Sequence, residues 1–222
     1  MSPLPRPERR RPPALDEETS LWRSGQMVIA GLDEAGRGAW AGPVFAAAAI
    51  LPPLCDSREA LHGVRDSKQM TARQRAYWAE RIRDLVWHCG VGQASAQEID
   101  LLGILPATRL AMSRALEACG ARAEHLLVDA LRLPDCAIPQ TALIKGDARS
   151  LSIAAASVLA KTARDAHMQE QELRYPGYGF SAHKGYGTAA HRAALARLGA
   201  CPLHRMSFAP LRGFILPGES YS

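Results

Sequence analysis

Four carboxylates end apolar runs that have the length of buried strands. Asp33 and Glu34 end MVIAGLDE, Asp129 ends HLLVD, and Asp147 ends ALIKGD. Because ligands of α/β folds gather beyond the carboxyl ends of neighbouring strands, we expect these acids to face one crevice. Crowded carboxylates repel one another unless a cation joins them. Hard oxygen ligands favour Mg²⁺ or Mn²⁺, so the pattern predicts a divalent metal site.

Hydrolysis of a phosphodiester is the chemistry that such a site serves best. Two divalent ions about 3.5–4 Å apart can activate water, neutralise charge and stabilise the leaving oxygen. Successive side chains of a strand point to opposite faces, so Asp33 and Glu34 can offer oxygens in two directions. Each acid alone has an ordinary interpretation as surface charge or turn, and only the joint pattern is specific.

A glycine-rich segment follows the first acidic pair. Gly36 and Gly38 flank Arg37 in GRGAWAGP. Glycines let backbone N–H and C=O groups approach a ligand closely, and an arginine can meet a phosphate. The segment matches neither GxxxxGKS nor GxGxxG, which disfavours a nucleotide-phosphate cradle. A plain hairpin connection is the alternative interpretation.

Positive charge is concentrated late in the chain. Residues 145–205 hold nine Lys and Arg against four Asp and Glu, which accounts for the whole net charge of +5. This predicts a face that binds a polyanion, although a solvated helix surface explains the charge equally well. In the loop HKGY, Lys184 could meet phosphate and Tyr186 could stack on a sugar or base. A packed aromatic and a solvated lysine are the alternative.

The composition is that of a globular protein with one main core. The chain has 222 residues, 47% of them hydrophobic and 22% charged, and can bury roughly 70% of its unfolded surface. No apolar run reaches the ~20 residues of a membrane span, and the N-terminus lacks the apolar core of a secretory signal. Five scattered cysteines without a CxxC pair argue against disulfides and structural zinc, and suit a reducing cytoplasm.

The residue patterns predict a mixed α/β sheet with helices on both faces. Apolar runs predict strands over residues 27–33, 43–51, 86–95, 125–131 and 141–147. Capping boxes at Thr71 and Ser95 predict helices to about residues 84 and 119, the second interrupted near Gly103. A long helix over 150–175 and a short one over 188–198 should follow. Residues 1–25, rich in proline and arginine, are expected to be disordered.

Together these motifs resemble one known family. GLDEAGRG followed by AGP, DSK before a capped helix, LLVDA, IKGD before SIAAASVLAK, and YGFSAHKGYGT resemble type 2 ribonuclease H, ribonuclease HII, from about Val28 to Phe208. The resemblance implies an RNase H-like mixed five-stranded sheet flanked by helices, with a small C-terminal helical part. It places a catalytic domain at 26–175 and a substrate-binding part at 176–222.

The resemblance also implies an activity and roles for residues. The family cuts RNA in RNA–DNA hybrids and nicks duplex DNA 5′ to an embedded ribonucleotide. The catalytic metal ligands would be Asp33, Glu34, Asp129 and Asp147. Gly36, Arg37 and Gly38 would sense the ribose 2′-OH, and Tyr186 would pack on the adjacent deoxyribose. Phosphate contacts are expected from Lys68, Lys145 and Lys184.

The resemblance further implies the partners of the protein. They would be a hybrid or a ribonucleotide-containing duplex, with no membrane. We expect a monomer, and the sequence leaves a sliding-clamp contact open.

Four residues in three motifs depart from the family pattern. Ala130 follows Asp129 where many relatives carry glycine, and because alanine avoids φ > 0 we expect a differently shaped loop there. Ala39 and Trp40 replace proline and an aliphatic residue, and Gln69 replaces a lysine. None of these removes an expected ligand.

Two other functions stay open at this point. Another two-metal nuclease on the same scaffold would keep the carboxylates but has no need of the GRG and HKGY elements. A non-catalytic nucleic-acid-binding module with a decayed site is disfavoured by the four intact acids.

Overall fold

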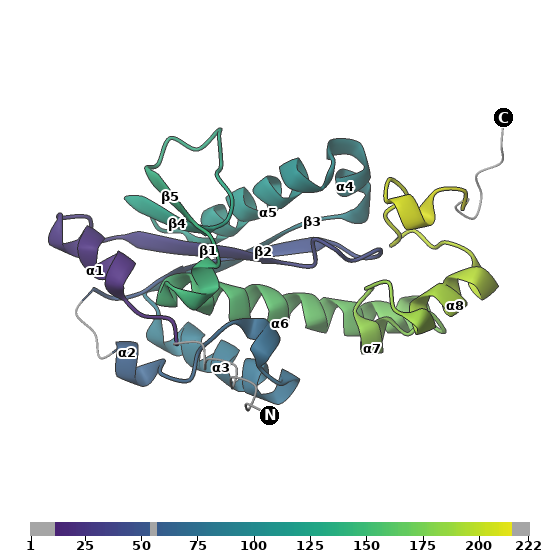
Figure 1. Cartoon of the computed structure of the whole chain (residues 1–222), viewed down its shortest axis with the longest axis horizontal. Helices are drawn as coiled ribbons and strands as arrows, with labels where there is room; N and C mark the ends of the chain where they lie inside the picture. Colours follow the sequence, from purple (N-terminus) through teal and green to yellow (C-terminus); the bar gives the residue numbers. More distant parts are fainter. Residues whose placement is uncertain (1–11, 54–56, 215–222) are drawn as a thin grey trace, which may run out of the picture.

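A mixed five-stranded sheet forms the centre of the molecule (Figure 1). The computed structural model describes residues 12–53 and 57–214. The strand order is β3-β2-β1-β4-β5. β1 pairs antiparallel with β2, which pairs antiparallel with β3, while β1–β4 and β4–β5 are parallel. The strands are β1 (Ile29–Ala35), β2 (Val44–Ile50), β3 (His88–Ala94), β4 (His125–Asp129) and β5 (Gln140–Leu143). The predicted mixed sheet is confirmed.

Helices cover both faces of this sheet (Figure 1). α4 (Ala96–Leu102) and α5 (Ile104–Cys119) lie on one face, and α3 (Ala72–Leu85) and α6 (Leu151–Arg174) on the other. The shorter elements are α1 (Asp16–Arg23), α2 (Ser57–Ala60), α7 (Phe180–His183), α8 (Ala189–Leu198) and the 3₁₀ turns η1 (Ser67–Gln69), η2 (Gly146–Ala148) and η3 (Ala209–Leu211). No helix in the described ranges is both long and apolar enough to cross a membrane.

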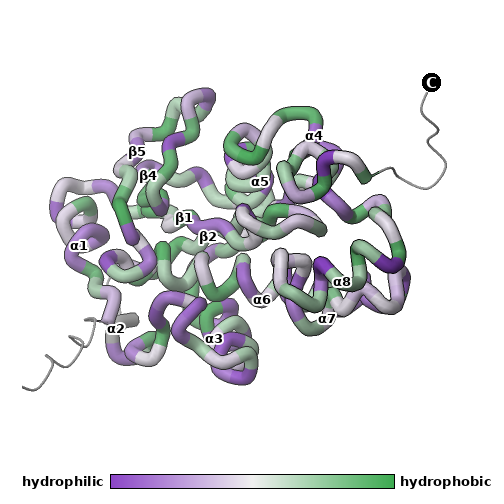
Figure 2. Tube along the Cα trace, turned by 45° about the vertical axis from the view of Figure 1, so that its right-hand side comes forward, coloured by the Kyte–Doolittle hydropathy of each residue, from purple (hydrophilic) through white to green (hydrophobic). Residues whose placement is uncertain are grey.

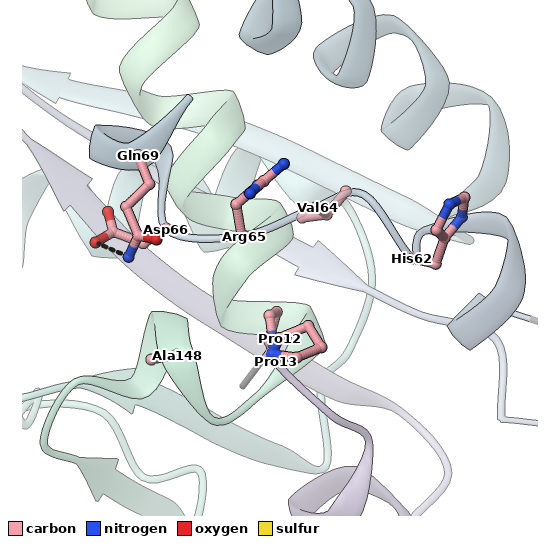
Figure 3. A pocket seen from close by; sticks show the side chains of 8 residues that line it. All are labelled: Pro12, Pro13, His62, Val64, Arg65, Asp66, Gln69 and Ala148. Carbon is pink, nitrogen blue, oxygen red and sulfur yellow. Dashed lines mark hydrogen bonds between the residues drawn. The ribbon is translucent and has the colours of Figure 1, made fainter. Parts of the chain in front are cut away.

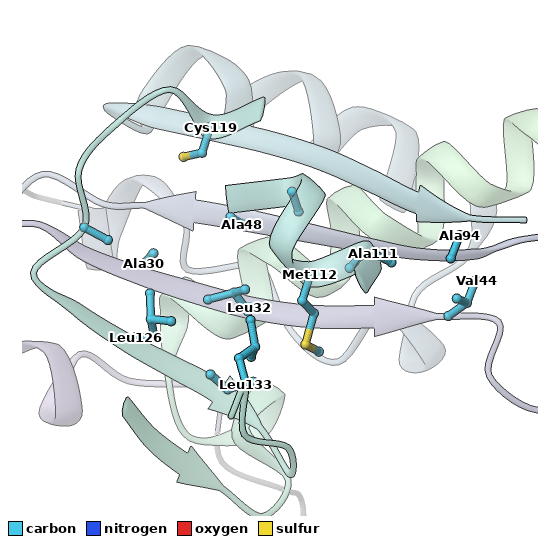
Figure 4. Packing of buried hydrophobic residues seen from close by; sticks show 14 of the residues in the cluster. Ala30, Leu32, Val44, Ala48, Ala94, Ala111, Met112, Cys119, Leu126 and Leu133 are labelled. Atoms are coloured by element: carbon cyan, nitrogen blue, oxygen red, sulfur yellow. The ribbon is translucent and has the colours of Figure 1, made fainter. Parts of the chain in front are cut away.

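Alternation along the strands builds two separate cores. Ala30, Leu32 and Ala48 face α5, where they pack with Met112 (Figure 4). Ala47 and other residues of the opposite face pack against α6 and α3. In Figure 2, α3 alternates between hydrophilic and hydrophobic colours, because it buries only the Ala79 and Ile82 side of an otherwise charged helix. One sheet therefore carries an apolar layer on each face.

Small residues allow the helices to approach the sheet closely. A Cβ on Gly31 in β1 would lie 2.3 Å from the Ser152 carbonyl carbon at the start of α6. A Cβ on Gly92 in β3 would lie 2.3 Å from the Ala111 carbonyl oxygen of α5. The alanine-rich face of α6 is buried in the same way. This close contact brings the start of α6 against β1, the strand that carries the first acidic pair.

The predicted helix starts are confirmed at both capping boxes. Thr71 caps α3 and accepts the Gln74 N–H at 3.2 Å, and Ser95 caps α4 and accepts the Glu98 N–H at 3.1 Å. Gly103, with φ of 83°, separates α4 from α5 at the expected interruption.

The N-terminal segment differs from the expected disordered tail. Residues 16–23 form α1, and Glu18 within it is 1% exposed. Its carboxylate accepts the Ser152 N–H at 2.9 Å and the Ser150 hydroxyl at 2.6 Å, which places a negative charge at the N-terminus of α6. The prediction was wrong for this helix because long-range contacts hold it: Glu18 is buried, and Leu21 and Trp22 pack against an apolar cluster that includes Leu127 and Ile153. Residues 1–11 lie outside the described range.

The C-terminal part packs on the second half of α6. Met168 of α6 contacts a cluster that includes Tyr178, Phe180 and Cys201. The loop between β1 and β2, residues 36–43, points toward this part of the molecule (Figure 1). The division into 26–175 and 176–222 stays a prediction, and residues 215–222 lie outside the described range.

Candidate active site

Asp33 lies within β1 and Asp129 ends the neighbouring parallel strand β4. Leu32 of β1 pairs with Val128 of β4, so the next residue of each strand is an aspartate at the same edge of the sheet. Asp147 follows β5, the third strand of this parallel set, but the strand ends at Leu143. Asp147 lies in the 3₁₀ turn η2, where it is 9% exposed. The sequence therefore predicted Asp33 and Asp129 on neighbouring strands, but it ended β1 two residues too early and β5 four residues too late.

The adjacent acids Asp33 and Glu34 lie in different surroundings. Asp33 is 5% exposed, and its Oδ1 accepts the Glu34 N–H at 2.7 Å. Glu34 pairs through Oε1 with Arg37 Nη1 at 3.1 Å. Asp129 accepts the Gly146 N–H at 2.7 Å, which ties the end of β4 to the turn that carries Asp147. The carboxylates are thus positioned by short local hydrogen bonds.

Burial and mutual repulsion raise the pKa of three of these acids. Burial raises the pKa of Asp33 well above its usual value, and the charges of Glu34 and Asp129 raise it further. Burial also raises the pKa of Glu34, against the opposing effect of Arg37. The pKa of Asp147 is raised by burial, then by Asp66 and Asp129. Each of these carboxylates would gain from a nearby cation.

The donor set fits a hard divalent cation. All four side chains offer oxygen, which Mg²⁺ and Mn²⁺ prefer. Oε2 of Glu34 is buried and has no hydrogen-bond partner, so one acceptor remains for a ligand. Across residues 12–53 and 57–214, no three His, Cys, Asp or Glu side chains converge closely enough to form a metal-binding group. The four carboxylates therefore affect one another through their electrostatic charge and not through direct contacts.

The segment DSK lies beside these acids. Burial opposes the charged form of Lys68, yet the charges of Asp33, Asp66 and Asp147 outweigh it and raise the Lys68 pKa. Ser67 forms a buried hydroxyl–hydroxyl hydrogen bond of 2.9 Å with Ser157 of α6. Lys68 is therefore held near the carboxylates, and its contact with phosphate stays a prediction.

A cavity of about 220 Å³ opens next to Asp147 (Figure 3). Its wall joins the segment before α1, the DSK segment and the turn η2. Asp66 faces it and accepts a hydrogen bond from Gln69 Nε2 at 3.1 Å. The lining residues are Pro12, Pro13, His62, Val64, Arg65, Asp66, Gln69 and Ala148. None of the four carboxylates lines the cavity; Asp66 links the two, because its charge raises the pKa of Asp147.

The two glycines of the GRG element lie in different surroundings within the β1–β2 loop. Gly36 has φ of 93°, and a Cβ on it would lie 1.9 Å from Arg164 Nε. Gly38 is exposed, and a Cβ there would meet nothing within 4 Å. The loop is thus tightly held at Gly36 and open to a ligand at Gly38.

The structure brings Tyr186 next to this loop. The Gly185 carbonyl accepts the Trp40 N–H at 2.8 Å and the Ala41 N–H at 3.2 Å. Tyr186 is 37% exposed, and its ring centre lies 5.4 Å from the Arg164 guanidinium carbon. Two segments that are about 150 residues apart in sequence therefore form one surface.

The other two lysines that were expected to contact phosphate are Lys145 and Lys184. Lys145 precedes the Asp147 turn and is exposed, with φ of 55°. Lys184 contacts the Ser181 carbonyl through Nζ. The structure shows both at the margin of the site.

The departures from the family pattern have structural consequences. The expectation of a different loop after Asp129 was wrong: Ala130 has φ of 52°, the left-handed conformation that favours glycine. Its N–H donates to the Leu143 carbonyl at 3.0 Å, which holds the strained conformation in place. Trp40 lies against the C-terminal part, with its ring 5.8 Å from that of His191.

Sequence reasoning missed two arginines that support the site. Arg164 and Arg205 are both 0% exposed and donate to backbone carbonyls around the β1–β2 loop. In the sequence they look like members of the basic stretch that was expected to face solvent or a polyanion. The one signal in the sequence that could have indicated burial of these arginines is the small residues near them, which leave room for a long side chain.

The sheet order and the acidic edge define a nuclease with the RNase H-like fold. The family model of ribonuclease HII matches residues 30–211. Ribonuclease HII of Synechococcus sp. is 57% identical over 200 residues, which cover 90% of each chain. Ribonuclease HII of Syntrophotalea carbinolica is 52% identical over 198 residues, 89% of this chain and 93% of the relative. The chain belongs to the ribonuclease HII family of metal-dependent endoribonucleases, which act on RNA–DNA hybrids.

Solved structures agree with this fold. The structure of ribonuclease H2 from Pyrococcus horikoshii has a TM-score of 0.69 at 25% identity, and the match covers 84% of this chain and 96% of that one. Bst-RNase HIII in complex with Mn²⁺ has a TM-score of 0.67 at 22% identity, covering 84% and 68%. The latter likeness supports the fold alone.

Proposed function

We propose that this protein cleaves the RNA strand of RNA–DNA hybrids and nicks duplex DNA 5′ to embedded ribonucleotides by two-metal hydrolysis. The observation that carries the proposal is the acidic edge itself. Asp33, Glu34, Asp129 and Asp147 come from three separate segments, and burial and the charges of neighbouring acids raise the pKa of three of them. Bound cations would offset the repulsion between these side chains and keep them ionised as carboxylates.

The four carboxylates would hold the ions, Mg²⁺ or Mn²⁺. When bound, such ions lower the pKa of water and neutralise the charge that develops on the phosphate. The Gly146 N–H holds Asp129 in place, and Arg37 holds one oxygen of Glu34 while leaving the other free. A neighbouring solved relative, Bst-RNase HIII, contains Mn²⁺, which supports a divalent ion here.

Recognition of the ribose would fall to the β1–β2 loop. Only the 2′-OH distinguishes RNA from DNA locally, and it both donates and accepts hydrogen bonds. At Gly38 the backbone is open, so its polar groups can approach the sugar without steric hindrance. Tyr186 is exposed beside this loop, where its ring can pack on the following deoxyribose and reject a further hydroxyl.

The cationic side chains would contact the phosphate backbone. Lys68 is held at the acidic edge, and Lys145 and Lys184 flank it on the stretch that carries the net positive charge. Such contacts position the nucleic acid without reading its sequence.

The state of the protein in the cell also belongs to this proposal. We propose a monomer in the cytoplasm. Four cysteines of the described residues are free, which agrees with a reducing compartment. A structure of the Archaeoglobus fulgidus relative shows it with PCNA, so a sliding clamp is the partner to test first.

A substrate panel tests the proposal against its alternatives. The protein is incubated with Mg²⁺ and four labelled substrates: a long hybrid, a DNA duplex with one ribonucleotide, plain duplex DNA and a four-way junction. We expect cleavage of the first two only. Cleavage of the junction or of plain duplex would favour another two-metal nuclease. Binding of the hybrid without cleavage would favour a non-catalytic module.

A further inference from the structure

Two buried cations lie beneath the proposed reading surface. Arg164 of α6 and Arg205 are both 0% exposed. Among the described residues neither forms an ion pair with a carboxylate. Each instead donates three hydrogen bonds, all of them to backbone carbonyls. A buried guanidinium without a counterion is costly, so its retention calls for a physical reason.

The Arg205 side chain donates its three hydrogen bonds to the β1–β2 loop. Its Nη2 donates to the Gly36 carbonyl at 2.8 Å and its Nη1 to the Arg37 carbonyl at 2.8 Å. Its Nε donates to the Gly42 carbonyl at 2.9 Å. One planar group thus fixes both ends of the loop that contains the GRG element.

Arg164 connects this loop to the segment that carries Tyr186. Its Nε donates to the Pro43 carbonyl at 3.0 Å, and its Nη2 to the Ala41 carbonyl at 3.1 Å. Its Nη1 donates to the Lys184 carbonyl at 2.9 Å, on the other side. The same guanidinium lies 5.4 Å from the centre of the Tyr186 ring. Arg164 therefore sets the spacing between the two segments.

The glycines of the two segments make this arrangement possible. A Cβ on Gly36 would collide with Arg164 Nε, and a Cβ on Gly185 would lie 2.3 Å from the Ala41 carbonyl oxygen. Arginine is suited to the task because its rigid planar fork can serve three carbonyls at once. The single ammonium of lysine keeps the charge but cannot reproduce that geometry.

We propose that Arg164 and Arg205 are positioning residues that lock the β1–β2 loop and the Lys184–Tyr186 segment into one rigid reader of the RNA-to-DNA junction. Arg205 sets the shape of the loop that reads the 2′-OH, and Arg164 sets its distance from Tyr186. The proposal rests on the function proposed above. Small misplacements of reading groups can cost about a hundredfold in rate.

The two arginines should therefore differ in their effect on two substrates. Arg205→Lys should lower kcat/KM to a similar degree on a DNA duplex with one ribonucleotide and on a long hybrid, because both present a 2′-OH. Arg164→Lys should lower kcat/KM on the single-ribonucleotide duplex about tenfold more than on the long hybrid. Only the single-ribonucleotide duplex requires the β1–β2 loop and Tyr186 to contact adjacent sugars at a fixed distance from each other.

Arg114→Lys is the matched control. Arg114 also donates to a backbone carbonyl, that of Gln93 at 2.8 Å, and pairs with Glu98, but it lies on α5 at the opposite face of the sheet. Thermal unfolding of every variant is recorded, and rates are measured well below the lowest midpoint. The control should keep the wild-type ratio between the two substrates.

The outcomes separate the possible explanations. A wild-type ratio in Arg164→Lys, which retains the charge, would overturn the proposal. If the arginine variants fail to fold, Gly185→Ala serves instead, since its Cβ pushes the two segments apart without touching either arginine. That variant should show the same selective loss, and an unchanged ratio would again overturn the proposal. Failure of the wild-type protein to cut either substrate would refute the proposed function itself.

Discussion

A pair of buried histidines should make the C-terminal part sensitive to acid. His191 and His204 are 0% and 1% exposed, and their Nε2 atoms lie 3.1 Å apart. His204 Nδ1 lies 2.9 Å from the Cys201 amide nitrogen and 3.2 Å from the Cys201 carbonyl oxygen. In the tautomer that accepts the Cys201 N–H, the proton is on Nε2 and points to His191. His191 Nδ1 can then donate to the Tyr186 carbonyl at 3.0 Å. Both rings are neutral in this arrangement, and a further proton would break it.

The size of the effect follows from the pKa values. Burial lowers the pKa of each histidine from 6.5 to about 4. Each unit corresponds to about 1.4 kcal/mol, so each histidine contributes roughly 3 kcal/mol, less than additive because the two share a hydrogen bond. A lowered pKa means that the unfolded chain binds more protons. This stability is therefore present above pH 6.5 and is lost as the pH falls toward 4.

Urea unfolding between pH 7 and pH 4.5, with chelator present, measures this loss. The variant His204→Asn keeps an oxygen that can accept the Cys201 N–H but no longer titrates. We expect the free energy of unfolding to fall less steeply with acid in the variant than in the wild type. The raised pKa values of Asp33, Glu34 and Asp147 act in the opposite direction, but equally in both proteins. Equal pH slopes would refute the reasoning.

Three further predictions concern single residues of the site. Asp129→Asn should leave folding and hybrid binding intact and lower turnover about a hundredfold or more, because an ion loses a ligand; single-turnover rates within tenfold of wild type would contradict this role. Tyr186→Ala should reduce cutting at single ribonucleotides more than cutting of long hybrids, and equal loss on both substrates would make Tyr186 a structural residue. Ala130→Gly should stabilise the protein by roughly 1 kcal/mol, since φ of 52° strains alanine; calorimetry that shows no rise in the melting temperature would argue against strain at this position.

The sequence was sufficient where a feature depends on neighbours along the chain. The positions of Asp33 and Asp129 follow from apolar runs of strand length, and the starts of α3 and α4 follow from local capping boxes. These features could be predicted from the sequence because each depends on only a few consecutive residues.

Features that depend on contacts between residues distant in the chain could not be predicted from the sequence. Arg164 and Arg205 resemble solvated residues until the fold surrounds them with carbonyls from the β1–β2 loop. Helix α1 is held by residues distant in sequence: Glu18 contacts residues more than 130 positions later, and Leu21 and Trp22 pack against an apolar cluster that includes Leu127 and Ile153. Ala130 accepts an unfavourable φ because its N–H bonds to the neighbouring strand. In each case a long-range contact outweighs the local preference.

The most direct test of the central claim uses an end-labelled DNA duplex with one ribonucleotide, beside an otherwise identical all-DNA duplex. Both are incubated with the protein in Mg²⁺, in Mn²⁺ and in chelator. The account predicts a single nick 5′ to the ribonucleotide in either metal, and none in chelator or in the control duplex. Cutting that persists in chelator, or that is equal in both duplexes, would contradict it.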